Sequence, residues 1–96
     1  MARSGVPQIS NIENAVRVYY LYPEIGNKEI AEIFGDRHSS CKIAALKQMV
    51  REEMINRNVR SFGIHTVNTG IAYEVWGLNI DDLEKRMEKL RKYGMI

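Results

Sequence analysis

The sequence predicts an all-α fold in which a three-helix bundle is followed by a short helix and a C-terminal amphipathic helix. Apolar residues recur at three- and four-residue spacing along most of the chain, and capping residues or glycines mark the ends of these stretches. The apolar content of 45% and the charged content of 27% are typical of a globular protein. A chain of 96 residues predicts a single domain over residues 1–96, without room for a separate catalytic module.

The first helix is predicted to begin at a capping box, Ser10-Asn11-Ile12-Glu13, after a loose arm over residues 1–9. Pro23 ends this helix, and residues 23–26 are predicted to form a turn. Its apolar face holds Ile12, Ala15, Val16, Tyr19 and Tyr20.

Two further helices complete the predicted bundle. Asn27 is expected to cap a short helix over residues 28–34, which Gly35 ends at a position that needs a tight or left-handed backbone. Ser39 is expected to cap a longer helix from about Ser40 to Ile55 or beyond. The inward anchors of this third helix are Ile43, Leu46, Val50 and Met54.

The opposite face of the third helix suits contact with DNA. Small or neutral residues occupy its centre, and cations flank it, as a helix needs if it is to enter a groove and contact phosphates. The distribution of charge along the chain also favours DNA contact by this helix, because residues 11–35 are acidic and residues 36–60 are basic. The net charge of the whole chain is only +2. The face consists of Cys41, Ala44, Ala45 and Gln48, flanked by Lys42, Lys47 and Arg51.

Residues 27–50 resemble the helix-turn-helix of bacterial and phage DNA-binding regulators, except that the turn from Gly35 to Ser39 is about two residues longer than the common pattern. Residues 68–90 are similar to C-terminal segments of small prophage-encoded proteins. These resemblances imply a transcriptional regulator or a DNA-packaging accessory of a phage or mobile element. Phage small terminase subunits combine such a motif with an oligomerising helical part.

Residues 10–57 are therefore predicted to be a DNA-binding part that contacts double-stranded DNA sequence-specifically. The amide of Gln48 is the best candidate for reading a base, since it can pair bidentately with adenine. The residues expected at the DNA interface are Arg37, Ser39, Ser40, Lys42, Ala45, Lys47, Gln48 and Arg51.

The rest of the chain is predicted to hold at most one strand and two helices. Residues 56–69 lack a helical period, so the hairpin of a winged helix is not expected there. Asn68 or Thr69 is expected to cap a short helix that Gly77 closes. The last helix is expected to run from near Asn79 to about Tyr93.

Residues 68–93 form a predicted C-terminal part that favours a homo-oligomer, most simply a dimer. Its last helix carries an apolar stripe that a small chain has little core to cover. Two alternatives remain open: the stripe packs on the first helix of its own chain, or the protein is a protein–protein interaction module without DNA contact. The stripe consists of Ile80, Leu83, Met87 and Leu90.

The sequence offers no support for an enzyme, a cofactor or a metal site. The single cysteine, Cys41, indicates a reducing and hence cytoplasmic setting, and no apolar stretch is long enough to span a membrane. Only His38 lies near Cys41 in the sequence, and His65 is 27 residues further on, so neither a catalytic thiol nor a zinc site is expected.

Overall fold

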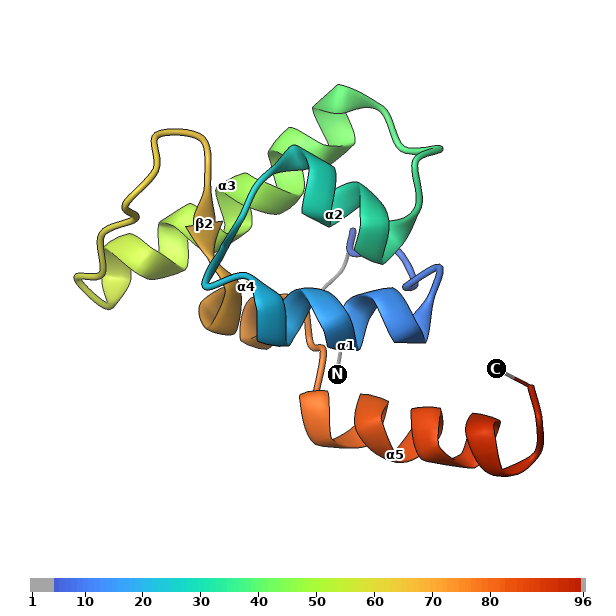
Figure 1. Cartoon of the computed structure of the whole chain (residues 1–96). Helices are drawn as coiled ribbons and strands as arrows, with labels where there is room; N and C mark the ends of the chain where they lie inside the picture. The colour runs from blue at the N-terminus through green and yellow to red at the C-terminus, as the bar shows by residue number, and fades with distance from the viewer. Residues whose placement is uncertain (1–4, 96) are drawn as a thin grey trace.

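The computed structural model describes residues 5–95 of the chain (Figure 1). These residues are mostly helical, as the sequence predicted, but a short two-stranded sheet means that the fold is not purely α. In chain order the elements are α1 (Ile12–Leu21), β1 (Glu24–Ile25), α2 (Asn27–Phe34), α3 (Ser40–Asn56), β2 (Val67–Asn68), α4 (Thr69–Val75) and α5 (Ile80–Lys92). Residues 1–4 of the predicted arm lie outside the described residues.

Most helix starts follow the predicted caps. The side chains of Ser39, Asn68 and Asn79 each accept a hydrogen bond from a main-chain N–H in the first turn of α3, α4 and α5. These bonds satisfy donors that would otherwise have no partner within the helix. The three predicted helix starts are confirmed.

Two predicted starts are wrong by one residue. Asn11, not Ser10, caps α1, because its side-chain oxygen accepts from the Asn14 N–H at 3.0 Å. Ser10 instead connects the start of α1 to α2, because its main-chain N–H donates to the carbonyl of Ile33 at 2.8 Å. Helix α2 begins at Asn27 itself, and a Glu29 side-chain oxygen accepts from the Gly26 N–H at 2.8 Å.

The two strands pair where the sequence predicted a turn and, at most, one strand. Glu24 lies opposite Asn68, and Ile25 lies opposite Val67, in an antiparallel pair. Both Ile25 and Val67 are fully buried. The predicted turn over residues 23–26 is therefore wrong, whereas the single strand expected within residues 56–69 is confirmed at Val67–Asn68.

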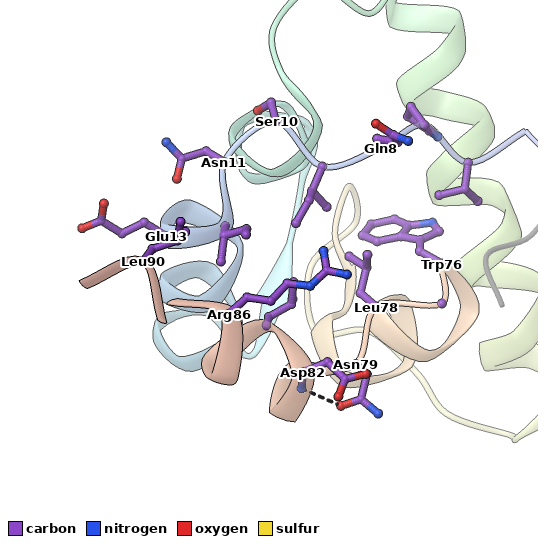
Figure 2. A pocket seen from close by; sticks show the side chains of 16 residues that line it. Gln8, Ser10, Asn11, Glu13, Trp76, Leu78, Asn79, Asp82, Arg86 and Leu90 are labelled. Carbon is purple, nitrogen blue, oxygen red and sulfur yellow. Dashed lines mark hydrogen bonds between the residues drawn. The ribbon is translucent and has the colours of Figure 1, made fainter. Parts of the chain in front are cut away.

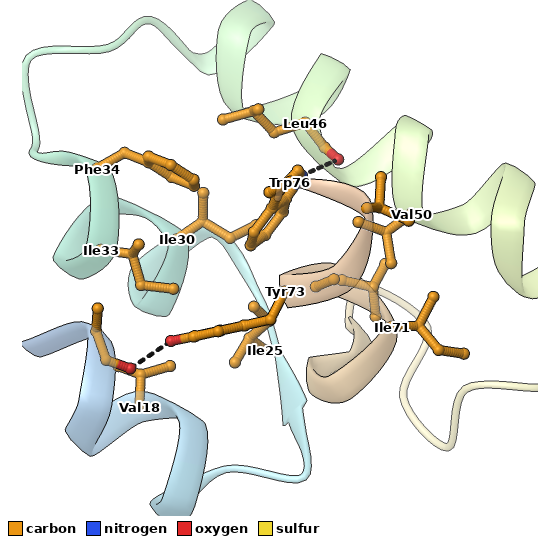
Figure 3. Close-up of a cluster of buried hydrophobic side chains, with 14 of the residues drawn as sticks. Val18, Ile25, Ile30, Ile33, Phe34, Leu46, Val50, Ile71, Tyr73 and Trp76 are labelled. Atoms are coloured by element: carbon orange, nitrogen blue, oxygen red, sulfur yellow. Dashed lines mark hydrogen bonds between the residues drawn. The ribbon is translucent and has the colours of Figure 1, made fainter. Parts of the chain in front are cut away.

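The core lies between α1, α2, α3 and α4, and its centre is Trp76 (Figure 3). The Trp76 ring packs edge-on against Phe34, with ring centroids 5.2 Å apart. Tyr73 is also buried and donates a hydrogen bond of 2.5 Å to the carbonyl of Ala15. Burial, followed by the neighbouring Tyr19, raises the pKa of Tyr73. Residues of the predicted DNA-binding and C-terminal parts thus share one core.

Helix α5 packs on α1, on the side away from α3 (Figure 1). Its first turn holds two acidic residues, Asp81 and Asp82, and its last turn holds three basic residues, Lys89, Arg91 and Lys92. Both groups interact favourably with the helix dipole and so stabilise the helix. Among the described residues, no helix is both long enough and apolar enough to cross a membrane.

Candidate nucleic-acid interface

Helix α3 presents one face to the core and the other to solvent. Ile43, Leu46, Val50 and Met54 are buried, as predicted, and they fix the rotation of the helix about its own axis. The outward face consequently holds side chains that are small or uncharged over the first half of the helix. Its exposed residues are Ser40, Cys41, Ala44, Ala45 and Gln48.

The α2–α3 connection holds the start of this face in place. Gly35 has φ +99°, a backbone conformation that residues with a Cβ rarely adopt, so the predicted need for glycine is confirmed. The Nε2 atom of His38 lies within hydrogen-bond distance, 3.1 Å, of the carbonyl oxygen of Phe34 at the end of α2. Arg37 and Ser39 are exposed in this turn.

Three predicted phosphate-binding cations lie along the edges of α3, and each donates to a neutral oxygen of the chain. Lys42 Nζ donates to the carbonyl of Gly5, and Lys47 Nζ donates to the side-chain oxygen of Asn27 at 2.9 Å. Arg51 donates to the carbonyl of Ile64 at 3.2 Å. These bonds orient the cations without neutralising them.

Two arginines elsewhere in the fold are paired with carboxylates. Arg17 lies 3.7 Å from Glu32, and Arg57 forms ion pairs with Glu53 at 2.8 Å and Glu74 at 2.5 Å. Within residues 5–95, by contrast, Arg37, Lys42, Lys47 and Arg51 form no such pair. The cations around α3 therefore lack carboxylate partners, as do Lys85, Arg86, Lys89, Arg91 and Lys92 on α5 within the same described residues.

The pKa of Lys47 is lowered by the surroundings of its ammonium group. Burial lowers the pKa of its ammonium group, and the positive charge of Arg51 one turn away lowers it further. An anion placed between the two side chains would relieve the repulsion between them.

Glu52 limits the length of the candidate face. It is exposed, and it lies on the same side of α3 as Ala45 and Gln48, seven and four residues earlier. A carboxylate repels phosphate, so the part of α3 that suits DNA extends from Ser40 to about Arg51.

A loop over residues 57–66 follows α3, and no motif in this segment indicates its role. Glu24 in β1 accepts hydrogen bonds from the Phe62 N–H at 2.6 Å, the Gly63 N–H at 3.0 Å and the Thr66 hydroxyl at 2.6 Å. Burial alone raises the pKa of Glu24, but these three bonds outweigh it and lower the pKa. One carboxylate thus fixes the shape of the loop.

The predicted oligomer stripe on α5 faces α1 of the same chain. Leu83 is buried in the core, and Ile80 and Met87 pack against that core while partly exposed. Leu90 lines an open cavity of about 720 Å³, which lies between α5, the start of α1 and residues 6–10 (Figure 2). The structure therefore adopts the alternative in which most of the stripe packs within its own chain.

The cavity has mixed chemistry. Leu78 and Trp76 form part of its wall, and Arg86 extends from α5 toward Leu78 (Figure 2). The indole nitrogen of Trp76 is used elsewhere, since it donates to the carbonyl of Leu46 at 3.2 Å. Asp82 and Glu13 also line the cavity, so together with Arg86 they give it both signs of charge.

Cys41 is exposed on α3, and the described residues hold no group of three or more side chains suited to bind a metal ion. A comparison of the chain with protein-family models, with curated proteins and with solved structures finds no match in any of the three.

Proposed function

We propose that this protein binds double-stranded DNA by placing α3 in the major groove, as the second helix of a helix-turn-helix formed with α2. The observation that supports this most strongly is the outward face of α3, which is neutral in its middle and flanked by cations without carboxylate partners. A major groove about 12 Å wide accepts an α-helix, and neutral side chains in the middle can approach base edges.

The proposal assigns two kinds of contact. Arg37, Lys42, Lys47 and Arg51 contact phosphates and fix the position of the protein on the duplex. Ser39, Ser40 and Gln48 face base edges, while Ala45 permits close approach. The resemblance to phage and bacterial helix-turn-helix proteins supports a regulator or a DNA-packaging accessory of a phage or mobile element as the cellular role.

Binding to duplex DNA at two salt concentrations tests the proposal. Wild-type protein is titrated into labelled duplexes from a random-sequence pool, and affinity is measured by fluorescence anisotropy at low and moderate salt. Replacing Lys42 and Arg51 with Ala should weaken binding to every sequence and flatten the dependence of log affinity on log salt by about 0.9 for each lost phosphate contact.

A matched variant separates local contact from net charge. Replacing Lys85 and Lys89 with Ala removes the same charge from exposed positions on α5, on the far side of α1. This control should retain most of the affinity and salt dependence. Equal losses in the two variants, with both folded by circular dichroism, would show that α3 is not the DNA contact.

A further inference from the structure

The loop over residues 57–66 exposes two large apolar side chains at its outer end. Phe62 is 99% exposed and Ile64 is 84% exposed. Burying an aromatic side chain is favourable by a few kcal/mol, and two large apolar side chains exposed on one short loop mark a candidate contact surface. We call residues 61–64 the loop tip.

The loop tip is held in a defined shape. The Glu24 carboxylate accepts from the N–H groups of Phe62 and Gly63, and the Ser61 hydroxyl donates to the Gly63 carbonyl at 3.0 Å. A Cβ at position 63 would lie 2.5 Å from the Thr66 hydroxyl oxygen, so the tight turn requires glycine. A contact made by Phe62 therefore needs little further ordering of the backbone.

The loop's own side chains are basic, and the Glu24 carboxylate beneath the tip already accepts from the N–H groups of Phe62 and Gly63 and from the Thr66 hydroxyl. Residues 57–66 contain Arg57, Arg60 and His65 and no carboxylate. Arg57 is paired with Glu53 and Glu74, whereas Arg60 forms no ion pair within residues 5–95. A hollow of about 380 Å³ beside the tip is lined by Arg51, Met54, Ile55, Val59, Arg60 and Ser61.

The loop tip also continues the proposed DNA face. Arg51 on the edge of α3 donates to the Ile64 carbonyl, so the last cation of the face contacts the loop directly. Gln48 and Asn56 are eight residues apart, which places the start of the loop roughly 12 Å along the helix axis. Neighbouring grooves of a duplex are centred roughly 17 Å apart, half of a 34 Å turn, so a loop at this distance is of the right scale to reach the groove next to the one that α3 occupies.

We propose that the loop tip enters the minor groove next to the major groove occupied by α3, where Phe62 wedges between two base pairs and Arg60 contacts a phosphate. This inference rests on the proposed function. Apolar wedges that unstack base steps from the minor groove are an established mode of DNA contact. A neutral apolar protein surface as partner would leave Arg51 and Arg60 without an anionic group to contact.

The experiment uses the full chain and a duplex that the wild-type protein selects from a random pool. 2-Aminopurine, which fluoresces when it is unstacked, replaces adenine at successive positions of that duplex. Wild-type protein should raise fluorescence at one step beside the segment that α3 protects. Phe62→Ala should remove this signal and weaken binding about tenfold, the scale of one lost base–aromatic contact.

Two variants make the result specific. Phe62→Trp keeps a flat aromatic ring and should preserve both the fluorescence signal and the affinity. Tyr93→Ala removes another exposed aromatic, 72% exposed at the end of α5, and should change neither. Since Phe62 is fully exposed, its replacement leaves the core intact.

The outcomes separate the two proposals. If no duplex in the pool binds wild-type protein, the proposed function fails and the loop contact fails with it. If wild-type protein binds but Phe62→Ala retains both affinity and fluorescence, only the loop contact is overturned. If Phe62→Ala instead abolishes a self-association seen by light scattering and leaves DNA binding unchanged, the loop tip is a protein contact and this inference is wrong.

Discussion

The indole nitrogen of Trp76 donates a 3.2 Å hydrogen bond to the main-chain carbonyl of Leu46 and so joins the end of α4 to the middle of α3 (Figure 3). Leu46 lies on the inward side of the helix whose outward side carries Ala45 and Gln48. The bond therefore helps to fix the depth and rotation at which α3 presents its exposed face.

Trp76→Phe should destabilise the fold by roughly 1–3 kcal/mol, because it removes this hydrogen bond and part of a buried ring. Urea unfolding followed by circular dichroism measures the loss, since the variant has no tryptophan left to report by fluorescence. Tyr93→Ala serves as the control, and its stability should match wild type. An unchanged urea midpoint in Trp76→Phe would contradict the role given to this contact.

Gly35→Ala should destabilise the protein by about 1–3 kcal/mol, because φ +99° is strained for any residue with a Cβ. Gly70→Ala is the matched control, since it lies within α4, where a Cβ would make only an ordinary 3.5 Å contact with the Asn68 side chain. That change should stabilise the helix by roughly 0.5–1 kcal/mol. Thermal unfolding of the two variants should therefore move in opposite directions.

The order of the 57–66 loop should depend on pH through Glu24. Its pKa is lower in the folded protein than the ordinary 4.5, so its contribution to stability is fully present above that value and is lost as the pH falls through the folded pKa. The protection of the Phe62 and Gly63 amides, which is their exchange rate corrected for the intrinsic effect of pH, should fall over this acidic range. In Glu24→Gln the exchange should be faster at neutral pH and should lose this step.

Gln48→Ala should reduce discrimination between DNA sequences more than it reduces total affinity. A bidentate amide contact with adenine contributes roughly 1–3 kcal/mol of preference over the wrong base. Affinities for a selected duplex and for random duplexes measure the difference, with Gln8→Ala as a control at an exposed amide outside α3. Equal weakening on both kinds of duplex would refute the assignment of Gln48 to base reading.

The stripe on α5 makes a prediction about assembly. Leu83→Glu places a carboxylate in the core and should unfold the chain broadly, whereas Leu90→Glu, at the edge of the cavity, should leave it folded. Light scattering of wild-type protein at micromolar concentration then measures the oligomer. The mass of one chain would end the expectation of a dimer, and a dimer that Leu90→Glu dissociates would place the interface at Leu90.

Helix positions were predictable because their signals are local. Ser39, Asn68 and Asn79 each cap the helix that follows them, and the inward positions of α3 follow directly from a 3.6-residue period. The strands were not predictable, since each has two residues and exists only through pairing across the fold. Ser10 was misassigned for the same reason, because its partner is Ile33 in a different helix.

The candidate site was predicted in composition but not in geometry. Spacing alone places Lys42, Lys47 and Arg51 on the edges of α3. Their partners Gly5, Asn27 and Ile64 come from other segments, and no periodicity along the chain indicates them. The hydrogen bonds by which Glu24 holds the 57–66 loop were not predicted, because no sequence pattern near Glu24 indicates partners that lie about 40 residues away.

The pairing of β1 with β2 has a consequence for how fast the protein folds and unfolds. Glu24 and Thr66, which hydrogen bond beside this sheet, are 42 positions apart, so closing the loop between them costs chain entropy before any bond forms. Helices α2 and α3 need only contacts between near neighbours in the chain. The sheet is therefore expected to form after the transition state, and substitutions in it should accelerate unfolding while leaving the refolding rate nearly unchanged.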